Sequence, residues 1–385
     1  MSKSFTVETL LHHEAALPAD LAAKISPERR ALWEVERQLW TPRAYISASG
    51  SVRGAVLTVG RPHTAYRKIV DVVVVDDSNP GDPVAALAVW ATLVDAARDD
   101  VPDVDASHPV PLVVHFEEHL QIAPLSQRYR DQLEVLGFSP APRPVPSIPS
   151  TRDGDSSEVA AWTWWRDERP TRLAPYYGQT TEVTCGAVAS LMALELLGAK
   201  GFDPHSLTEN RAAEITFWRK ATNLPACEPI ALAVEIAKSG GSLLSGLPRV
   251  ILSTDEPVLL EEFASDEAET MLRTDLQRES LRQAQELGIP IERRWIEVEE
   301  IAEFVRAGAQ VLLLIDLTEL IADPTPHWVL ASDVVGDNLI VSDPWVHYPN
   351  GETWVDTFAL PIPLTGVDLV TRWGDPSYRG VVVLP

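Results

Sequence analysis

The sequence predicts two folded domains: an N-terminal α/β domain and a C-terminal α+β domain in which a helix carrying a cysteine packs on an antiparallel sheet. Three observations support this prediction. The chain has 385 residues, of which 45% are apolar, enough to build two hydrophobic cores. Strands and helices alternate in the first part of the chain, and a helix followed by a hairpin is predicted in the second part. A proline-rich and polar stretch separates the two parts.

This stretch sets the expected domain boundaries. Prolines recur at 140, 142, 144, 146 and 149, and the polar segment "STRDGDSSE" follows them. Such a segment is typical of a linker because it contains little that can pack in a core. We therefore expect a first domain over residues 1–145, a linker over 146–160 and a second domain over 161–385.

The elements of the first domain follow from local patterns. Residues 53–60 and 67–77 are predicted strands, and the second is a β-branched run suited to a buried position. Residues 82–100 show helical periodicity after an aspartate and a proline. A further strand over 110–116 and a helix over 124–137 complete an α/β domain.

The sequence "HFEEH" at 115–119 combines four titratable side chains. Its spacing differs from the metalloprotease pattern H-E-x-x-H, and successive side chains on a strand point to opposite faces. We therefore predict a solvated strand edge here. No other group of Cys and His residues has the spacing of a zinc site, so we expect no metal and no cofactor.

In the second domain, Cys185 opens a predicted helix. Ala187, Leu191 and Leu194 recur at helical spacing, and Gly198 is a suitable stop. The free backbone amides and the dipole at a helix N-terminus favour a thiolate over a thiol. Cys185 is therefore the candidate nucleophile.

Two neighbours of Cys185 are candidates for contact with a substrate. Gly186 lets a substrate backbone approach closely, and Gln179 can donate an amide N–H beside the backbone N–H of Cys185, forming an oxyanion hole. The second cysteine, Cys227, also precedes a predicted helix. It has no nearby glutamine and no following glycine, so we expect a structural role for it.

A base partner for the thiolate is expected far away in the sequence. Residues 327–335 and 338–344 are predicted strands joined by the turn "GDN", which is a hairpin signal. The hairpin brings His327, at its start, to the same end as Asp343, at its finish. Asp343 can then fix the orientation of the imidazole while the other ring nitrogen serves Cys185.

Two tryptophans flank this pair in the sequence. Trp328 follows His327, and Trp345 lies two residues after Asp343. Most tryptophans belong to hydrophobic cores, but these two are also placed to shelter the imidazole or to line a substrate groove. We count both as candidate substrate-binding residues.

Charge and hydropathy restrict the partners. The formal net charge of −24 repels phosphate backbones and anionic lipids, so nucleic acid and membrane partners are disfavoured, whereas a cationic peptide is compatible. No stretch approaches eighteen apolar residues, and the first 21 residues lack the apolar core of a signal peptide. Two cysteines cannot form a disulfide framework. We expect a cytoplasmic protein.

The order of strands and helices over residues 5–145 resembles the GNAT acetyltransferase fold. In that family a glycine-rich, basic turn before the central helix binds the pyrophosphate of acetyl-CoA on backbone amides. The corresponding turn here, "DDSNPGDPVAA" at 76–86, is acidic and contains one glycine. The resemblance therefore implies a degenerate GNAT-like domain.

The sequences "GQTTEVTCGAVASLMAL" and "PHWVLASDVVGDNLIVSDP" resemble the papain-like cysteine peptidases that process double-glycine leader peptides of bacteriocins, and more closely their soluble bacterial relatives. The resemblance covers residues 170–385. It implies Cys185 as nucleophile, His327 as base, Asp343 as the orienting residue and Gln179 as the oxyanion donor. No ATP-binding-cassette or membrane domain accompanies these motifs, so the exporter role of the leader peptidases is not implied.

The expected activity is acyl transfer from an amide or thioester through an acyl-enzyme on Cys185. If water accepts the acyl group, the enzyme is a peptidase, and if an amine accepts it, the same residues make a ligase, cyclase or acyltransferase. The substrate is expected to be a peptide or a peptide-like molecule, cationic or carrier-bound, in bacterial peptide maturation or natural product biosynthesis. The alternatives are a non-catalytic peptide-binding protein with two degenerate domains, and a working GNAT acetyltransferase.

Overall fold

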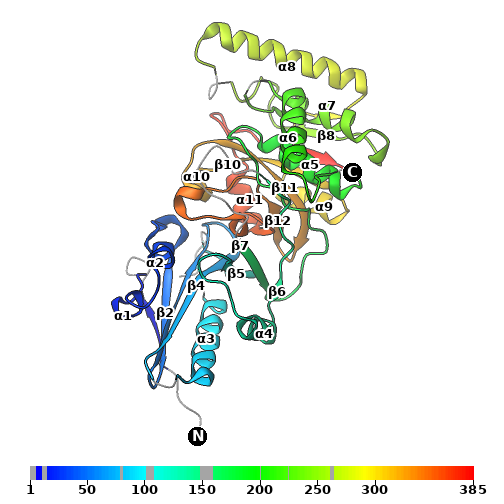
Figure 1. Ribbon diagram of the computed structural model, residues 1–385. Helices are drawn as coiled ribbons and strands as arrows, with labels where there is room; N and C mark the ends of the chain where they lie inside the picture. The colour runs from blue at the N-terminus through cyan, green and yellow to red at the C-terminus, as the bar shows by residue number, and fades with distance from the viewer. Residues whose placement is uncertain are drawn as a thin grey trace. The chain divides into compact units, whose positions relative to one another are not determined.

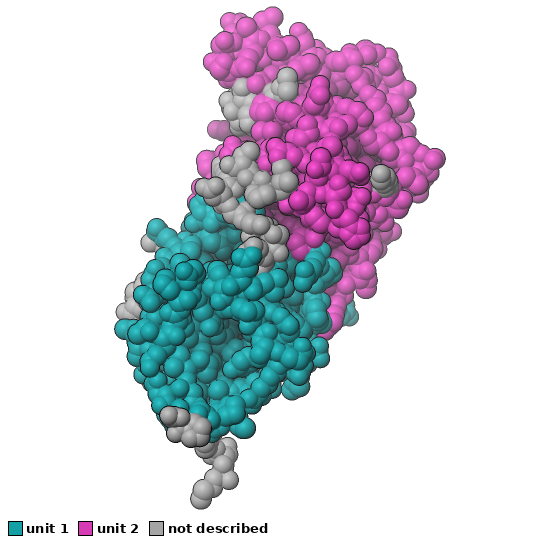
Figure 2. Space-filling view, viewed as in Figure 1, with its two compact units in different colours: residues 1–143, 156–168, 347–356 teal, residues 144–155, 169–346, 357–385 magenta. Residues whose placement is uncertain are grey.

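A computed structural model gives the structure of the chain, and it divides into two compact units (Figure 2). The residues described are 6–10, 15–78, 81–100, 108–147, 159–199, 201–223, 225–260 and 264–385. Unit 1 comprises residues 1–143, 156–168 and 347–356. Unit 2 comprises residues 144–155, 169–346 and 357–385. Most of the predicted linker over 146–160 lies outside the described residues.

Unit 1 is built on a seven-stranded sheet in the order β1-β2-β3-β4-β5-β7-β6 (Figure 1). Neighbouring strands are antiparallel except β4 and β5, which are parallel. A parallel pair needs a crossover connection, which α3 provides. The strands are β1 (Thr6–Leu10), β2 (Arg43–Ser49), β3 (Val52–Val59), β4 (Tyr66–Asp76), β5 (Val113–His119), β6 (Ser139–Pro140) and β7 (Val159–Trp165).

The helices of unit 1 are α1 (Ala19–Ala22), α2 (Pro27–Glu34), α3 (Pro83–Arg98) and α4 (Gln127–Val135). Helix α3 packs on β2, β3 and β4, and its buried side chains, among them Val89, Trp90 and Leu93, form the core with the facing strand residues. The predicted strands and helices of the first domain are therefore confirmed. The structure also places β7 in this sheet, although the prediction assigns residues 159–160 to the linker and residues 161–165 to the second domain.

The predicted solvated edge at 115–119 is wrong. Strand β7 pairs with β5 along its whole length, so β5 is an internal strand. His115, Glu117 and Glu118 are each no more than 2% exposed. Burial lowers the pKa of His115 to about 4, which keeps its imidazole neutral at pH 7.

A ten-residue segment from late in the chain, residues 347–356, is part of unit 1. Two of its carboxylates are completely buried against basic side chains. The Arg61 guanidinium donates to Glu352 through Nε at 2.5 Å and Nη2 at 2.6 Å, and Lys68 Nζ lies 2.5 Å from Asp356 Oδ2. Burial alone would lower the pKa of Lys68, but the charge of Asp356 is the first of several effects that raise it above its ordinary value. The segment is therefore fixed in unit 1 by two buried ion pairs.

Unit 2 is built on a second seven-stranded sheet, in the order β13-β12-β11-β10-β14-β8-β9. All neighbours are antiparallel except β8 and β9. The strands are β8 (Arg249–Leu252), β9 (Ile291–Glu292), β10 (Gln310–Asp316), β11 (Pro326–Val335), β12 (Asn338–Ser342), β13 (Leu360–Pro363) and β14 (Gly380–Leu384).

The helices of unit 2 are α5 (Cys185–Leu196), α6 (Leu207–Ala221), α7 (Pro229–Gly240), α8 (Glu267–Leu287), α9 (Val298–Arg306), α10 (Thr318–Ile321) and α11 (Leu364–Val370). Helix α5 packs on β11 and against α6 and α7, and α8 packs along α7 (Figure 1). The mixture of helices with a mainly antiparallel sheet is the predicted α+β architecture. Within the described ranges, no helix combines the length and the apolar character needed to cross a bilayer.

Candidate active site

Helix α5 begins at Cys185, as predicted from the sequence. Gly198 follows its end in the left-handed region at φ +84°, which confirms the predicted stop. Thr184, the residue before the helix, makes no capping hydrogen bond with its side chain, so its hydroxyl does not occupy the backbone N–H groups of the first turn. The thiol of Cys185 therefore lies at the positive end of the helix dipole.

The β11–β12 hairpin brings His327 and Asp343 together, as predicted. Its turn places Gly336 at φ +57°, and the two strands then return to the same end of the sheet. His327 Nε2 lies 2.7 Å from Asp343 Oδ1, and the backbone N–H of Trp345 donates to the same oxygen at 2.8 Å. Both partners of the pair are buried, at 3% and 1% exposure. Asp343 is thus oriented by two donors.

Cys185 and Asp343 both act on the charge of His327. Burial by itself would lower the pKa of His327, but the charge of Asp343, the charge of Cys185 and side-chain hydrogen bonds to both raise it to about 10. Since Nε2 is used by Asp343, Nδ1 is the ring nitrogen that remains for Cys185. Cys185, His327 and Asp343 thus form a continuous series, with the imidazole in the middle.

This arrangement predicts the titration of His327. Its pKa of about 10 in the folded protein exceeds the ordinary value of 6.5, so the protonated ring contributes stability that is complete below pH 6.5 and is lost as the pH rises through 10. We expect NMR of the imidazole to show a charged ring throughout the neutral range, and Cys185→Ala to lower the midpoint. A ring that is neutral at pH 7 in the unmodified protein would contradict the ion pair.

Gln179, the predicted oxyanion donor, lies in the loop before α5 and is 5% exposed. Its backbone N–H donates to the carbonyl of Pro344 at 2.8 Å, which attaches this loop to the residue after Asp343. Its Nε2 donates to the carbonyl of Thr181 at 2.7 Å and retains a second hydrogen. The oxyanion role of Gln179 stays a prediction, with its loop fixed beside the His327–Asp343 pair.

Glu214, on α6, is a residue of the site that the sequence patterns did not indicate. It is fully buried, and its carboxylate accepts hydrogen bonds from the Tyr177 hydroxyl at 3.0 Å and from the backbone N–H and hydroxyl of Thr180 at 2.8 and 2.7 Å. The hydroxyl of Thr184 donates to it as well. These donors come from both ends of the loop that carries Gln179, so Glu214 fixes the loop that leads into α5.

Replacing Glu214 by alanine is expected to lower the free energy of unfolding by about 2–4 kcal/mol, because several buried donors lose a charged acceptor at once. Denaturation in urea would measure this change. Glu209→Ala, at an exposed position on the same helix, is the matched control and should have little effect. Equal effects of the two substitutions would show that the buried carboxylate does not hold the loop.

Gly186 and Trp328 are both packed against Cys227 in the core of unit 2. A Cβ at Gly186 would lie 3.1 Å from Cys227 Cβ and 3.1 Å from Trp328 Cδ1. The Trp328 indole is 2% exposed and donates to the carbonyl of Cys227 at 2.8 Å. Helix α5 can therefore approach β11 closely only with glycine at this position. Contact of either residue with a substrate stays a prediction, as it does for Trp345, which is 6% exposed.

Cys227 lies in the core beside α5 and is 2% exposed. Burial, followed by the charges of Cys185 and Glu228, raises the pKa of the Cys227 thiol well above its ordinary value. A thiol that stays protonated is a poor nucleophile. These contacts agree with the structural role expected for Cys227.

Comparison with known proteins assigns the sequence to a family. The model of the Peptidase_C39 like family matches residues 174–385, which contain all four predicted catalytic residues. A solved structure of a C39-like peptidase from Bacillus anthracis is 10% identical, covers 57% of this chain and 98% of that chain, and has a TM-score of 0.27. No curated protein matches the chain. The family match extends over more than half of the chain, and the protein belongs to the Peptidase_C39-like family, whose papain-like α+β fold unit 2 provides.

Proposed function

We propose that the protein is a cysteine peptidase that cleaves a peptide substrate through an acyl-enzyme on Cys185. The observation that carries the proposal is the hydrogen-bonded series Cys185, His327 and Asp343 at the N-terminus of α5. A thiolate paired with an imidazolium is nucleophilic at neutral pH and has a proton donor beside it. Membership of the Peptidase_C39-like family supports the same type of activity.

The chemistry follows from the position of each group. The Cys185 thiolate attacks the carbonyl carbon of the scissile amide, and the oxyanion is stabilised by the Cys185 backbone N–H and the Gln179 amide. The His327 imidazolium donates its proton to the leaving nitrogen as the C–N bond breaks. Neutral His327 then takes a proton from water as it attacks the thioester, which releases the carboxylic acid and restores the ion pair. If an amine replaces water, the same steps make a new amide. The alternative to a peptidase is then a ligase, a cyclase or an acyltransferase that uses the same residues.

A peptide library tests this proposal because it samples many substrate sequences at once. The protein is incubated with peptides derived from a bacterial proteome, and new termini are quantified by mass spectrometry. We expect cleavage by the unmodified protein and by Cys227→Ser, and none by Cys185→Ala. Spliced or cyclised products in place of new free carboxyl termini would identify the ligase outcome. Absence of any Cys185-dependent product would favour the alternative of a non-catalytic peptide-binding protein.

For unit 1 we infer a structural role and not acetyl transfer. Asp82 caps α3 by accepting hydrogen bonds from the backbone N–H groups of Val84 and Ala85 at 3.0 and 2.9 Å. Asp76 accepts from the hydroxyl of Ser78 and from the backbone N–H groups of Ser78 and Asp82, and these bonds hold its pKa below the ordinary value. The amides that a GNAT-like domain would offer to a pyrophosphate are thus bonded to carboxylates of the chain itself. An anion would meet two negative charges there.

This inference predicts the outcome of calorimetry with acetyl-CoA. We expect no heat of binding for the unmodified protein at millimolar ligand, because two carboxylates occupy the amides at the start of α3. A dissociation constant in the micromolar range, lost on addition of free CoA as a competitor, would restore the GNAT acetyltransferase as the working function of unit 1.

A further inference from the structure

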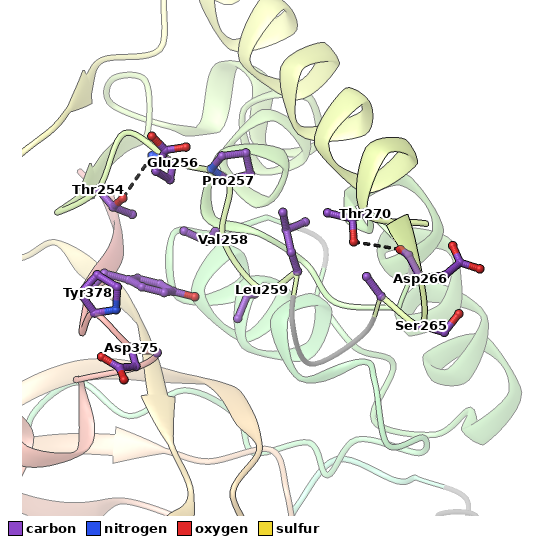
Figure 3. Close-up of a pocket in the computed structure, with 14 residues that line it drawn as sticks. Thr254, Glu256, Pro257, Val258, Leu259, Ser265, Asp266, Thr270, Asp375 and Tyr378 are labelled. Atoms are coloured by element: carbon purple, nitrogen blue, oxygen red, sulfur yellow. Dashed lines mark hydrogen bonds between the residues drawn. The ribbon is translucent and has the colours of Figure 1, made fainter. Parts of the chain in front are cut away.

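Unit 2 contains a cavity of about 610 Å³ that the catalytic residues do not line (Figure 3). Its walls come from three places: the loop after β8, the start of α8, and the turn before β14. The volume lies within the range of ligand sites in proteins. The lining residues include Glu256, Val258, Leu259, Asp266, Asp375 and Tyr378.

The register of the sheet fixes the place of this cavity relative to His327. In the row of residues that cross the sheet, Val329 of β11 is aligned with Leu313 of β10, then with Val381 of β14 and Ile251 of β8. Toward one end of this row, His327 pairs with Ile315, and Gly380 pairs with Leu252. Just beyond Leu252, Ser253 donates its backbone N–H to the Arg379 carbonyl at 3.0 Å. The cavity begins at the next residues, Thr254 and Tyr378. It therefore opens at the same end of the sheet as His327.

The register also gives the separation. Three strand spacings of about 4.8 Å lie between His327 on β11 and Ser253 on β8, or roughly 14 Å in total. An extended peptide advances about 3.4 Å per residue, so about four residues span this distance. A peptide whose scissile bond lies at Cys185 and which runs across the end of the sheet reaches the cavity with its fourth or fifth residue from that bond.

The wall formed by the loop after β8 is preformed. Gln277 of α8 accepts from the backbone N–H of Val258 at 3.0 Å and donates to its carbonyl at 2.6 Å, and Arg293 donates to the carbonyl of Thr254 at 2.6 Å. Leu259, directly after the second attachment, has φ +56°, a backbone conformation that leucine rarely adopts. Such outliers persist where the surrounding structure fixes them and are concentrated at binding sites.

The chemistry of the lining indicates the ligand. Among the described residues that line the cavity, the charged ones are Glu256, Asp266 and Asp375, all acidic and all exposed. Val258 and Leu259 are buried in the wall of the cavity, and the ring of Tyr378 forms another part of the wall (Figure 3). Exposed carboxylates attract a cationic side chain. The aliphatic part of a lysine or arginine side chain, or an apolar residue next to it in a peptide, can cover the apolar part of the wall.

We propose that this cavity is a substrate subsite for a lysine or arginine with an adjacent apolar residue, four or five positions from the scissile bond. The inference rests on the proposed function, since it assigns the cavity to the peptide that Cys185 attacks. It names the substrate class as a basic, partly apolar peptide. We expect recognition at this distance to appear in the binding of the peptide.

The test uses peptide electrophiles that label Cys185, with no natural substrate required. Two series of hexapeptides carry either a C-terminal chloromethyl ketone or an N-terminal chloroacetyl group, so that each side of the scissile bond is sampled. Positions four and five from the electrophile are Leu-Arg or Leu-Glu, and alanine fills the rest. The triple variant Glu256→Gln, Asp266→Asn and Asp375→Asn removes the charges, and Asn at 266 keeps a helix cap. The matched control is Asp275→Asn, Glu279→Gln and Glu286→Gln on the exposed face of α8.

In one of the two series we expect the Leu-Arg peptide to inactivate the unmodified protein roughly tenfold faster than the Leu-Glu peptide, through a lower half-saturation concentration. The cavity variant should reduce this ratio to near one, and the control should retain it. Equal rates for both peptides in both series, or the same ratio in the cavity variant, would overturn the subsite. Labelling of Cys185 by iodoacetamide distinguishes a failure of the subsite from a failure of the proposed function. Rapid labelling would support Cys185 as the nucleophile even if the subsite is wrong, and slow labelling would contradict the proposed function itself.

Discussion

Replacing His327 by alanine is expected to slow peptide cleavage by about 10⁴-fold, because the thiolate loses its counterion and the leaving nitrogen loses its proton donor. The substrate is a peptide identified from the library, and kcat/KM is the measured quantity. Asp343→Asn should have a smaller effect, since an amide oxygen still accepts from His327 Nε2 and from the Trp345 N–H. A larger decrease in kcat/KM for His327→Ala than for Asp343→Asn would agree with His327 as the base and Asp343 as the residue that orients it.

The control for this prediction is His205→Ala. His205 lies in an exposed turn before α6, and its substitution should leave cleavage unchanged. Imidazole added to the buffer should restore part of the activity of His327→Ala by filling the space of the missing ring. Retention of more than about a tenth of the activity in His327→Ala would show that another group supplies the base.

The second large effect is expected in unit 1. Arg61→Leu leaves the Glu352 carboxylate buried without its bidentate partner, and breaking a buried pair in this way lowers the free energy of unfolding by about 3–5 kcal/mol. Two neutral donors to Glu352 remain, the Trp40 indole at 2.9 Å and the His347 backbone N–H at 2.8 Å. We expect Tm to fall by about 10 °C, as seen by differential scanning calorimetry.

Two variants distinguish loss of the buried pair from a general effect of substitution. Arg61→Leu combined with Glu352→Leu removes both charges and should recover much of the lost stability. Arg282→Ala breaks ion pairs on the exposed surface of α8 and should leave Tm unchanged. A double variant that is no more stable than Arg61→Leu would show that apolar packing cannot replace the pair.

Local sequence patterns were sufficient to predict the helix and the hairpin that carry the candidate catalytic residues. The recurrence of apolar residues after Cys185 set the start of α5, and the glycine in the turn at 336–338 set the register that pairs His327 with Asp343. Both signals act over fewer than twenty residues. The side chains of the pair meet because a hairpin returns the chain to its starting end.

Other features depend on pairing between distant residues and could not be predicted from local patterns. The burial of 115–119 requires β7, which comes some forty residues later and lies partly in the expected linker. The segment 347–356 belongs by position to the second domain, yet it is held in unit 1 by buried charges. Glu214 contacts the catalytic loop across about thirty residues of chain. Charged residues are expected at the surface from sequence alone, and only their partners show that they are buried.

The rate of alkylation of Cys185 by iodoacetamide as a function of pH tests the central claim most directly, because it needs no substrate. Peptide mapping separates Cys185 from Cys227, and Cys227→Ser confirms the assignment. We predict rapid labelling of Cys185 at pH 6 to 7, well below the pKa of about 8.5 of a free thiol, and loss of this labelling in His327→Ala. Labelling that follows an ordinary thiol, with the same profile in both proteins, would contradict the thiolate–imidazolium pair and with it the assignment of Cys185 as the nucleophile.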